Sequence, residues 1–434
     1  MQKNSERRDI PLPVSVCMMS GVHWFRTRVV NLLAGIVLVI AGQANELSQT
    51  EEKQTEHGSF LDRFSGKPSG RLEWDVASLV KSDPAGNLAG RSVRARLRRV
   101  RLAYELQMGD QVPAILKADF GFASGTADIK DLYVGFKNAP KLGLVRAGNL
   151  KEPTTLEGTM SSRFVTFMER GLPVATFWPE RNLGLSIGRA LPSQRATWQL
   201  AAFFDDELSF DRDVKWSSQS GNRFSGRLTG LPLNRLNDES RKLLHLGVSG
   251  TIVNPRDDTV QYTSTPESSL APQLLDTGSI RADQNLIMAL EAAYVEGPFS
   301  LQTEYIGNWV RQSQGSTAFL NGYYVSGSWL LTGESRSYRP KSGEFGGITP
   351  KHNFSFTGGA GAWELAIRFS HLNLSDSGIA GGRLNDFTGG INWILTPKMR
   401  MQFNYVLSKY KQAPSTGFTS GQAHTVQARW HVHF

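Results

Sequence analysis

The segment Val426-Gln-Ala-Arg-Trp-His-Val-His-Phe434 decides the fold class of this chain. Apolar residues occupy every second position from Val426 to Phe434, and polar or charged residues occupy the positions between them. A period of two places the two sets on opposite faces of a β-strand. One face is therefore apolar and carries aromatic residues, whereas the other face suits water. This pattern is typical of a strand that lies between lipid and a wet interior.

The same alternation recurs at 131–136, 364–371 and 399–407, and the links Glu296–Pro298 and Thr396–Lys398 are typical of tight turns. Longer polar stretches separate other strands: 257–281, 334–353 and 411–422. Short turns at one rim and long loops at the other are the layout of a transmembrane barrel, and roughly 390 residues accommodate about 16 strands. We therefore predict an all-β protein, a transmembrane antiparallel β-barrel of about 16 strands.

A soluble protein of two packed sheets would show similar alternation, because alternation says only that one face is apolar. A terminal Phe434 after such a strand is, however, a recurring end of outer-membrane barrels. Aromatic residues such as Trp393, Tyr405 and Trp430 also lie near expected strand ends, where membrane girdles form. The mean hydropathy of −0.30 excludes several apolar helical spans but not a barrel, whose strands average to neutral hydropathy.

The N-terminal region carries the one strong apolar run, Val29–Ile40, which follows Arg26 and Arg28 and precedes Ala41–Ala44. A basic flank, a short apolar core and small residues predict a secretory signal peptide over 1–44, cleaved after Ala44. A single anchor helix is the alternative, but the run is shorter than the about 20 residues that a span needs. The long basic region also allows translation to start at Met18 or Met19. Two further parts are then expected: a flexible periplasmic lead-in, 45–70, and the barrel, 71–434.

The single cysteine, Cys17, lies before the apolar run, so the mature chain is expected to lack cysteine. That excludes a disulfide, a thiolate zinc site and a cysteine nucleophile. The chain carries 48 Lys and Arg against 39 Asp and Glu. This basic excess favours an anionic lipid or solute, while export argues against nucleic acid as the partner.

The stretch Arg91-Ser-Val-Arg-Ala-Arg-Leu-Arg-Arg-Val-Arg-Leu-Ala-Tyr104 is the most unusual in the chain. Its arginines alternate with apolar residues, but the alternation shifts by one position between Arg98 and Arg99. An arginine facing lipid at mid-membrane costs about 2–4 kcal/mol, so both arginine sets are expected to face the lumen, with a bulge that absorbs the shift. Guanidiniums about 7 Å apart can pass an anion from one to the next. We call this set the arginine ladder: Arg94, Arg96, Arg98, Arg99 and Arg101.

Two alternatives to an anion path remain open for the ladder. Its arginines could be rim charges that bind lipopolysaccharide phosphates, or luminal carboxylates such as Asp119 and Asp131 could neutralise them. Further cationic candidates lie nearby in sequence: Lys117, Lys130, Lys151 and Arg163.

Other chemistry is poorly supported by the sequence. His431 and His433 share a strand face but lack a third ligand for a metal, and a wet luminal face explains them. Glu157, Ser161 and Ser162 would suit an outer-membrane lipid hydrolase, but no Gly-x-Ser-x-Gly elbow occurs. Phosphate-loop and dinucleotide motifs are also missing. We expect no enzyme activity, no cofactor and no metal.

Several segments, in order along residues 71–434, resemble the phosphate- and pyrophosphate-selective porin O and P family. They are Arg98–Leu102, Asp131–Phe136, Gly148–Pro153 with Leu156-Glu157, Phe167–Arg170, Gly297–Leu301 with Glu304-Tyr305, Gly322–Val325, Leu331–Ser335, Gly361–Leu365 and Asn392-Trp393.

The resemblance implies a 16-stranded barrel in the outer membrane of Gram-negative type, usually a homotrimer, with an inward-folded third loop. The stretch Gly148–Gly184 would form that constriction, since it follows a strand and then loses the period of two. By motif match, Arg98, Arg99, Asp131 and Lys151 would be pore residues. The chain departs from the family in its lysines, because a central cluster of three cannot be placed, which affects phosphate selectivity more than anion preference.

These observations predict a passive outer-membrane channel that prefers anions, with phosphate or polyphosphate as solute. The pore-lining candidates are Arg94, Arg96, Arg98, Arg99, Arg101, Lys117, Asp131 and Lys151. The alternative is a closed structural or adhesive outer-membrane barrel without selective transport.

Overall fold

A computed structural model of the chain describes residues 64–82, 90–108, 114–123, 126–204, 221–236, 241–411 and 420–434. The predicted signal peptide, 1–44, lies outside the described residues, as does the predicted lead-in up to Arg63. Strand β1 (Phe64–Ser82) begins inside the segment predicted as a flexible lead-in. Its first residue already pairs with β2 (Gly90–Met108), Phe64 opposite Met108. The end of the predicted lead-in, from Phe64 onward, is therefore a strand and not a flexible segment.

In the part of the chain that the structure describes, sixteen long strands form the wall. After β1 and β2 they are β3 (Ala114–Ala123), β4 (Thr126–Ala139), β5 (Gly143–Lys151), β6 (Arg181–Ala190), β7 (Ala196–Phe203), β8 (Gly221–Leu236), β9 (Arg241–Pro255), β13 (Ile280–Glu296), β14 (Phe299–Gln312), β15 (Thr317–Leu330), β18 (Ala362–Asp376), β19 (Ile379–Thr396), β20 (Met399–Lys411) and β21 (Ser420–His433). The smaller elements are the helices α2 (Leu156–Thr159) and α3 (Leu172–Phe177) and the short strands β10 (Thr259–Val260), β11 (Thr263–Ser264), β12 (Leu275–Asp276), β16 (Tyr338–Arg339) and β17 (Glu344–Phe345).

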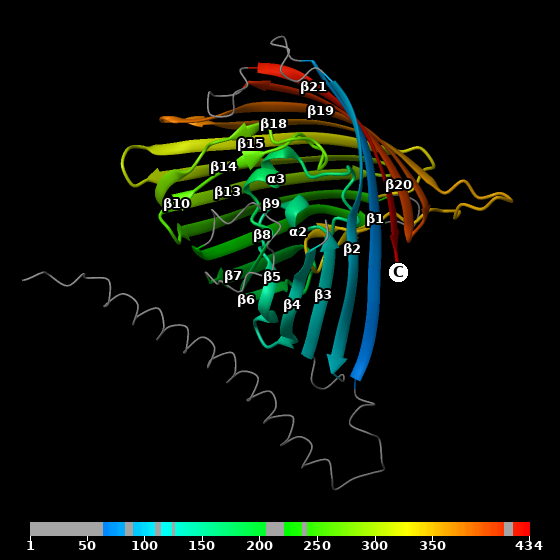
Figure 1. The fold of residues 1–434 in the computed structure, drawn as a ribbon. Coiled ribbons are helices and arrows are strands. Elements are labelled where there is room, and N and C mark those ends of the chain that lie inside the picture. Colours follow the sequence, from blue (N-terminus) through cyan, green and yellow to red (C-terminus); the bar gives the residue numbers. More distant parts are fainter. Residues whose placement is uncertain are drawn as a thin grey trace, which may run out of the picture. The chain divides into compact units, whose positions relative to one another are not determined.

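Each long strand is antiparallel to its neighbours, and the last strand, β21, pairs with the first, from Arg71 opposite His433 to Ser82 opposite Gln422. The sheet is thus closed into the barrel seen in Figure 1. Closure matters because backbone groups in lipid have no water to bind, so an open sheet edge would be costly. Among the described residues no helix is long and apolar enough to cross a membrane.

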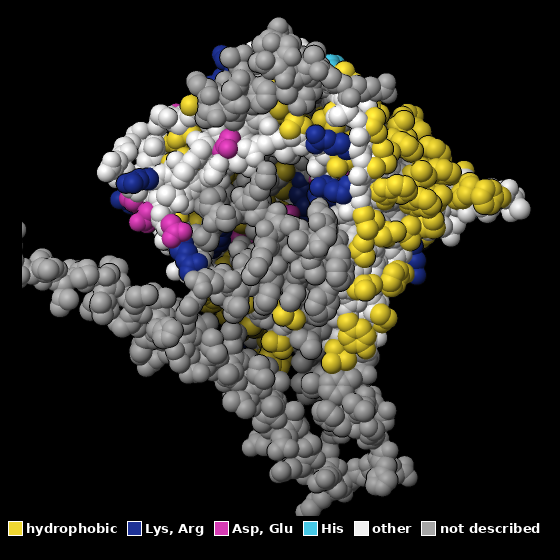
Figure 2. Space-filling model, in the orientation of Figure 1, with side chains coloured by type: hydrophobic (Ala, Val, Ile, Leu, Met, Phe, Trp, Pro, Cys, Tyr) yellow, Lys and Arg dark blue, Asp and Glu magenta, His cyan; other side chains and the backbone are white. Residues whose placement is uncertain are grey.

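The two faces of the wall have opposite character, as the sequence predicts. On β1, Trp74 is 52% exposed on the outer face, whereas the adjacent Glu73 is 1% exposed on the inner face. On β21, Trp430 points outward and Arg429 is buried inside. Figure 2 shows the outward hydrophobic side chains gathered in a broad band over the strands. The chain exposes apolar residues to lipid and encloses charge.

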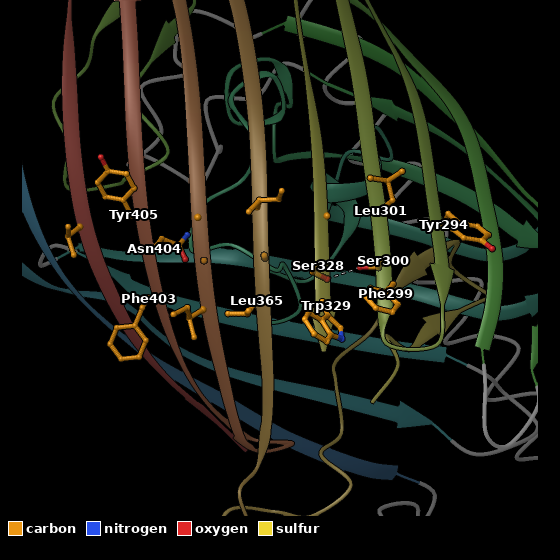
Figure 3. Close-up of a pocket in the computed structure, with 17 residues that line it drawn as sticks. Tyr294, Phe299, Ser300, Leu301, Ser328, Trp329, Leu365, Phe403, Asn404 and Tyr405 are labelled. Carbon is orange, nitrogen blue, oxygen red and sulfur yellow. Dashed lines mark hydrogen bonds between the residues drawn. The ribbon is translucent and has the colours of Figure 1, made fainter. Parts of the chain in front are cut away.

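One concavity of the described surface belongs to this outer band. It is a shallow groove of about 790 Å³ over strands β13 to β21, shown in Figure 3. Phe299 and Trp329 stack with their ring centroids 5.6 Å apart, and Phe403 and Tyr405 lie farther along the groove. Because its lining is almost entirely apolar and faces outward, we assign the groove to the lipid-facing surface and not to a solute path.

The connection between β15 and β18, residues 331–361, lies at the rim of the short turns. At the end of β15, Leu330 N donates to Pro298 O at 3.0 Å, and within the segment Phe354 N donates to Leu395 O at 2.7 Å. The segment thus begins beside one tight turn of that rim and is bonded to another. The expectation that the long polar stretches all share the opposite rim is therefore wrong for 334–353. The reason is strand parity: two strands, β14 and β15, separate this connection from the turn at Gly297, so the chain has returned to the same rim.

Three of the connections that the structure describes fold into the lumen: 152–180 after β5, 256–279 after β9, and 331–361 after β15. Arg368 on β18 receives the first two, donating to Glu157 at 3.3 Å and to Glu267 at 2.9 Å. Arg227 on β8 receives the third by donating to Gly343 O at 2.9 Å. The predicted inward fold of Gly148–Gly184 is confirmed for 152–180. The sequence pattern did not predict that the other two segments, 256–279 and 331–361, fold inward.

These segments form apolar cores inside the barrel. Helix α3 and segment 256–279 pack against strands β9 to β19, with Phe177 edge-on to Tyr262 at 5.5 Å. Helix α2 packs with Phe345 of the third segment against β8, β9 and β13. Segment 256–279 also packs on β1, where Leu270 and Ala271 contact Ala77 and Leu79. A space remains inside the barrel beside β1, β2 and β4 to β6.

Candidate functional site

The arginine ladder lies on β2 beside this remaining space. Val93 and Leu97 are 65% and 48% exposed on the outer face, so Arg94 and Arg96 point inward. Pairing with β1 shifts between Glu73, opposite Arg99, and Trp74, opposite Leu97. This leaves Arg98 as the extra residue of a β-bulge, at the position that the sequence predicted. Both arginine sets consequently face the lumen.

The outermost ladder residues touch backbone oxygens of segment 256–279. Arg94 donates to Leu270 O at 3.1 Å and Arg96 donates to Ser269 O at 3.2 Å. Carbonyl dipoles orient a guanidinium but do not cancel its charge. In these two contacts Arg94 and Arg96 therefore meet neutral acceptors and not carboxylates.

The middle of the ladder is paired with carboxylates. Arg98 lies 3.3 Å from Glu169 of the inward segment 152–180, and Arg99 lies 2.6 Å from Glu73 on β1. Arg429 on β21 also binds Glu169, at 2.8 Å. Glu169 thus bridges two strands from inside the lumen and fixes the inward segment against the basic wall.

Two acidic residues of the inward segment 152–180, Glu169 and Glu180, have lowered pKa values. Burial alone would raise the pKa of Glu169, but Arg98, Arg429 and Arg99 hold that pKa below its ordinary value. Burial likewise opposes ionisation of Glu180, yet Arg170 and Arg181 lower its pKa to about 2. Both carboxylates are charged at neutral pH and lose that charge only when the pH falls through these lowered values.

Below the ladder lies a basic cavity of about 260 Å³ between the wall, segment 152–180 and segment 331–361. Its lining includes seven cationic side chains and two acidic ones. The cationic residues are Arg71, Arg101, Arg146, Lys151, Arg163, Arg181 and Arg339, and the acidic residues are Asp131 and Glu344.

Two of the predicted pore residues in this basic cavity have structural partners. Asp131 accepts from Arg181 Nε at 2.6 Å, in a side-chain ion pair that is largely buried. The Lys151 ammonium donates to Thr159 O at 3.0 Å and Met160 O at 2.9 Å, at the carboxyl end of α2. Lys151 thereby holds the inward segment in place, and its charge remains without a paired carboxylate in these contacts.

The structure brings most predicted site residues together. Arg101, Asp131, Lys151 and Arg163 line the basic cavity, and the rest of the ladder lies above it. Lys117 belongs to β3, whose strand pairing is described but whose side chains, Asp119 included, lie outside the described set. Sequence reasoning missed four cations of the basic cavity. These are Arg71, Arg146, Arg181 and Arg339.

A local signal existed for only part of the missed set. Arg181 opens the strand after the constriction segment, and Arg71 stands where the alternation begins. Arg339 lies in a polar stretch that looks like an ordinary loop. Among the described side chains no group of three or more His, Cys, Asp or Glu is placed to hold a metal, and the rings of His431 and His433 lie 5.2 Å apart.

A closed antiparallel barrel of sixteen strands, with an apolar outer face and a lumen narrowed by inward segments, is an outer-membrane porin. Residues 67–434 match the family model described as phosphate-selective porin O and P, and the chain belongs to this family. Its proteins are channels of the outer membrane.

Individual relatives agree with this assignment. An uncharacterised protein of Caulobacter vibrioides is 27% identical over 360 residues, which cover 80% of this chain and 69% of the relative. Porin O of Pseudomonas aeruginosa is 27% identical over 143 residues, 30% of this chain and 31% of that protein. Among solved structures, the anion-selective porin from Comamonas acidovorans shares the fold with a TM-score of 0.54 at 14% identity, covering 86% of this chain and all 100% of that one.

Proposed function

We propose that this porin is a passive diffusion channel that prefers anions, with phosphate or polyphosphate as the favoured solute. The observation that carries the proposal is the basic cavity, in which seven cationic side chains face two acidic ones beneath the arginine ladder. A lumen wall of one sign concentrates ions of the opposite sign and excludes ions of its own.

The ladder supplies a series of moderate sites and not one deep site. Alternate residues of a strand are about 7 Å apart, which is close enough for an anion to move between neighbouring guanidiniums. At the middle, Glu169 and Glu73 compete with the solute for Arg98 and Arg99. That competition weakens anion binding where the arginines are densest, and conduction requires such weak, repeated binding.

The preference for phosphate is inferred from arginine chemistry and from the family. A guanidinium matches two phosphate oxygens with two parallel N–H donors. Lys151 is the one lysine in the lining of the basic cavity as described, so arginine replaces the lysine cluster of the family's phosphate-selective members. The family description names phosphate, and the name of the Comamonas porin refers to anions in general.

We also propose a homotrimer in contact with outer-membrane lipid and lipopolysaccharide. A similar barrel, OmpT of Vibrio cholerae, has been solved in a trimer form, at 10% identity and a TM-score of 0.52. Chemical crosslinking of the protein in native outer membranes is expected to give a band at three times the monomer mass.

The test of the channel proposal is the reversal potential of the purified protein in planar bilayers across a potassium chloride gradient. We expect a sign that reports chloride preference, and we expect added phosphate to block chloride current at lower concentration than added sulfate does. A cation-selective potential would refute the proposal. A reconstituted barrel that carries no current would instead favour the closed structural or adhesive barrel.

A further inference from the structure

The third inward segment also sends a turn out of the barrel. Residues Lys351–Ala360, which we call the aromatic foot, leave the lumen at the rim of the short turns and contact the outer edge of the wall. Phe354 N donates to Leu395 O at 2.7 Å, and Trp393 Nε1 donates to Ala360 O at 2.9 Å. Within the foot, Ser355 N donates to Gly359 O at 3.0 Å. These bonds hold the foot at both ends in a defined turn.

A row of aromatic rings runs from the wall to the tip of the foot. Trp363 on β18 stacks on Trp393 of β19 at 5.1 Å, Phe354 meets Trp393 edge-on at 5.0 Å, and Phe356 meets Phe354 at 5.2 Å. The tip residue, Phe356, is 98% exposed. An exposed phenyl ring that continues a larger exposed apolar surface marks a contact with lipid or protein.

The foot is continuous with the lipid-facing band. Trp363 lies on the same face of β18 as the exposed Leu365, and Trp393 lies on the same face of β19 as the exposed Ile391. In Figure 1 this orange-yellow part of the chain projects beyond the ends of the strands, and in Figure 2 the hydrophobic band extends onto the projection without a break. The ring row is therefore an extension of the surface that already touches lipid.

The charge of the foot suits a phospholipid surface. Lys351 and His352 are exposed at its base, and the stretch Thr349–Ala360 contains no Asp or Glu. Aromatic rings at the depth of the headgroups, with cationic side chains beside them, are the usual anchors at a membrane interface. The rim of short turns is the periplasmic rim in outer-membrane barrels, so the leaflet within reach is the periplasmic one.

We propose that the aromatic foot inserts into the headgroup region of the periplasmic leaflet and binds phospholipid there. Phe354 and Phe356 lie at the boundary with the acyl chains, and Lys351 lies near the phosphates. The foot thus fixes the membrane depth of the rim from which segment 331–361 enters the lumen. This interaction does not depend on which ion the pore carries.

Site-directed spin labelling tests the proposal in the intact protein. Phe356 is replaced by cysteine in a Cys17→Ser background, where it is the one cysteine, and carries a nitroxide. The labelled barrel is reconstituted in vesicles of phosphatidylethanolamine and phosphatidylglycerol. Collision rates with oxygen, which partitions into lipid, and with a water-soluble nickel chelate are then compared.

Two matched positions calibrate the measurement: Leu365→Cys on the lipid-facing band and Gln314→Cys in an exposed connection at the opposite rim. We expect the oxygen-to-nickel ratio at 356 to exceed that at 314 several-fold and to approach that at 365. A ratio equal to that at 314 would place the foot in water and overturn the proposal.

Low collision with both reagents would also overturn the proposal, since it would show that a second copy of the chain covers the foot. A second label at Thr357 guards against loss of the Phe356 ring as the cause of a negative result, because that variant retains both phenylalanines. Failure of this inference would leave anion selectivity untouched, because the reversal potential is measured separately.

Discussion

The two sides of the barrel interior contain similar residues but differ in packing and in charge balance. Along β8 to β19, arginines are enclosed by carboxylates and apolar side chains, as where Arg227 binds Glu291 at 2.8 Å. Along β1 to β6, cations outnumber carboxylates and border open space. The comparison teaches that a buried arginine does not define a conducting site by itself. The balance of charge and the presence of space decide which side can carry ions.

The filled side should respond most strongly to loss of one charge. Arg368→Met would leave Glu157 and Glu267 buried without their common cation, at a cost of about 3–5 kcal/mol. Segments 152–180 and 256–279 are then expected to loosen, which widens the lumen. We expect a lower temperature of barrel unfolding on heat-modifiability gels and a larger, less selective single-channel conductance.

The matched control for this change is Arg383→Met, at an exposed strand position where the arginine donates to Asn373. If Arg368→Met behaved like this control, the inward segments would be held by apolar packing alone.

The basic side should respond more in selectivity than in stability, because Arg429 still binds Glu169 when Arg98 is changed. The triple variant Arg94→Gln, Arg96→Gln and Arg98→Gln removes three luminal charges while keeping a polar, uncharged side chain at each position. Since one charge acting through water at 4 Å is worth ~1 kcal/mol, we expect the anion-to-cation permeability ratio to fall by about tenfold or more. Reversal potentials measure this ratio.

A control substitution, Lys398→Gln, removes a charge from an exposed turn at the rim and should leave the ratio close to that of the wild type. An unchanged ratio in the triple variant would show that the ladder is not on the ion path.

A smaller effect is expected from Glu169→Gln, which removes the carboxylate that Arg98 and Arg429 share. Anions should then bind the middle of the ladder more tightly, by about fivefold for each ~1 kcal/mol of lost competition. Conductance should saturate at correspondingly lower phosphate concentration. Glu296→Gln, an exposed rim residue paired with Lys242, is the matched control. Weaker binding in Glu169→Gln would contradict a competing role for this carboxylate.

The smallest change is expected for Arg339→Gln in the basic cavity. Its side chain is about half exposed and lies 3.7 Å from Glu344, so solvent screens its charge. We expect the phosphate block of chloride current to weaken by roughly twofold. An effect as large as that of the triple variant in the arginine ladder would indicate that the main anion site lies at segment 331–361 and not on β2.

The fold could be predicted from the sequence because the residues of a barrel strand themselves show which face meets lipid. Alternation along 426–434 and 399–407 fixes which side chains face lipid, and no distant contact is needed to read it. The bulge at Arg98 was predictable for the same reason. A charged side chain that faces lipid is unfavourable whichever strands lie beside it.

The arrangement of side chains in the lumen could be predicted only in part, because luminal contacts join residues far apart in the chain. Arg71 donates to Ser162 and Arg227 donates to Gly343. The sequence around these residues indicates neither contact. Counting strands from the turn at Gly297 would have predicted which rim of the barrel carries segment 331–361. Its entry into the lumen was not predictable, because a polar stretch that lines a wet interior has the composition of an external loop.

The bulge in β2 has a consequence for changes in chain length. Because Arg98 is the extra residue, its deletion would leave an unbroken alternation in which Leu97 is followed by Arg99. Every other side chain of the strand would stay on its present face. Deletion of Ala95 would instead bring Arg94 next to Arg96, so one of them would have to turn toward lipid unless the bulge moved. Insertions and deletions in this strand are therefore position-dependent, and residue 98 is where a relative of different length can differ without reversing the wall.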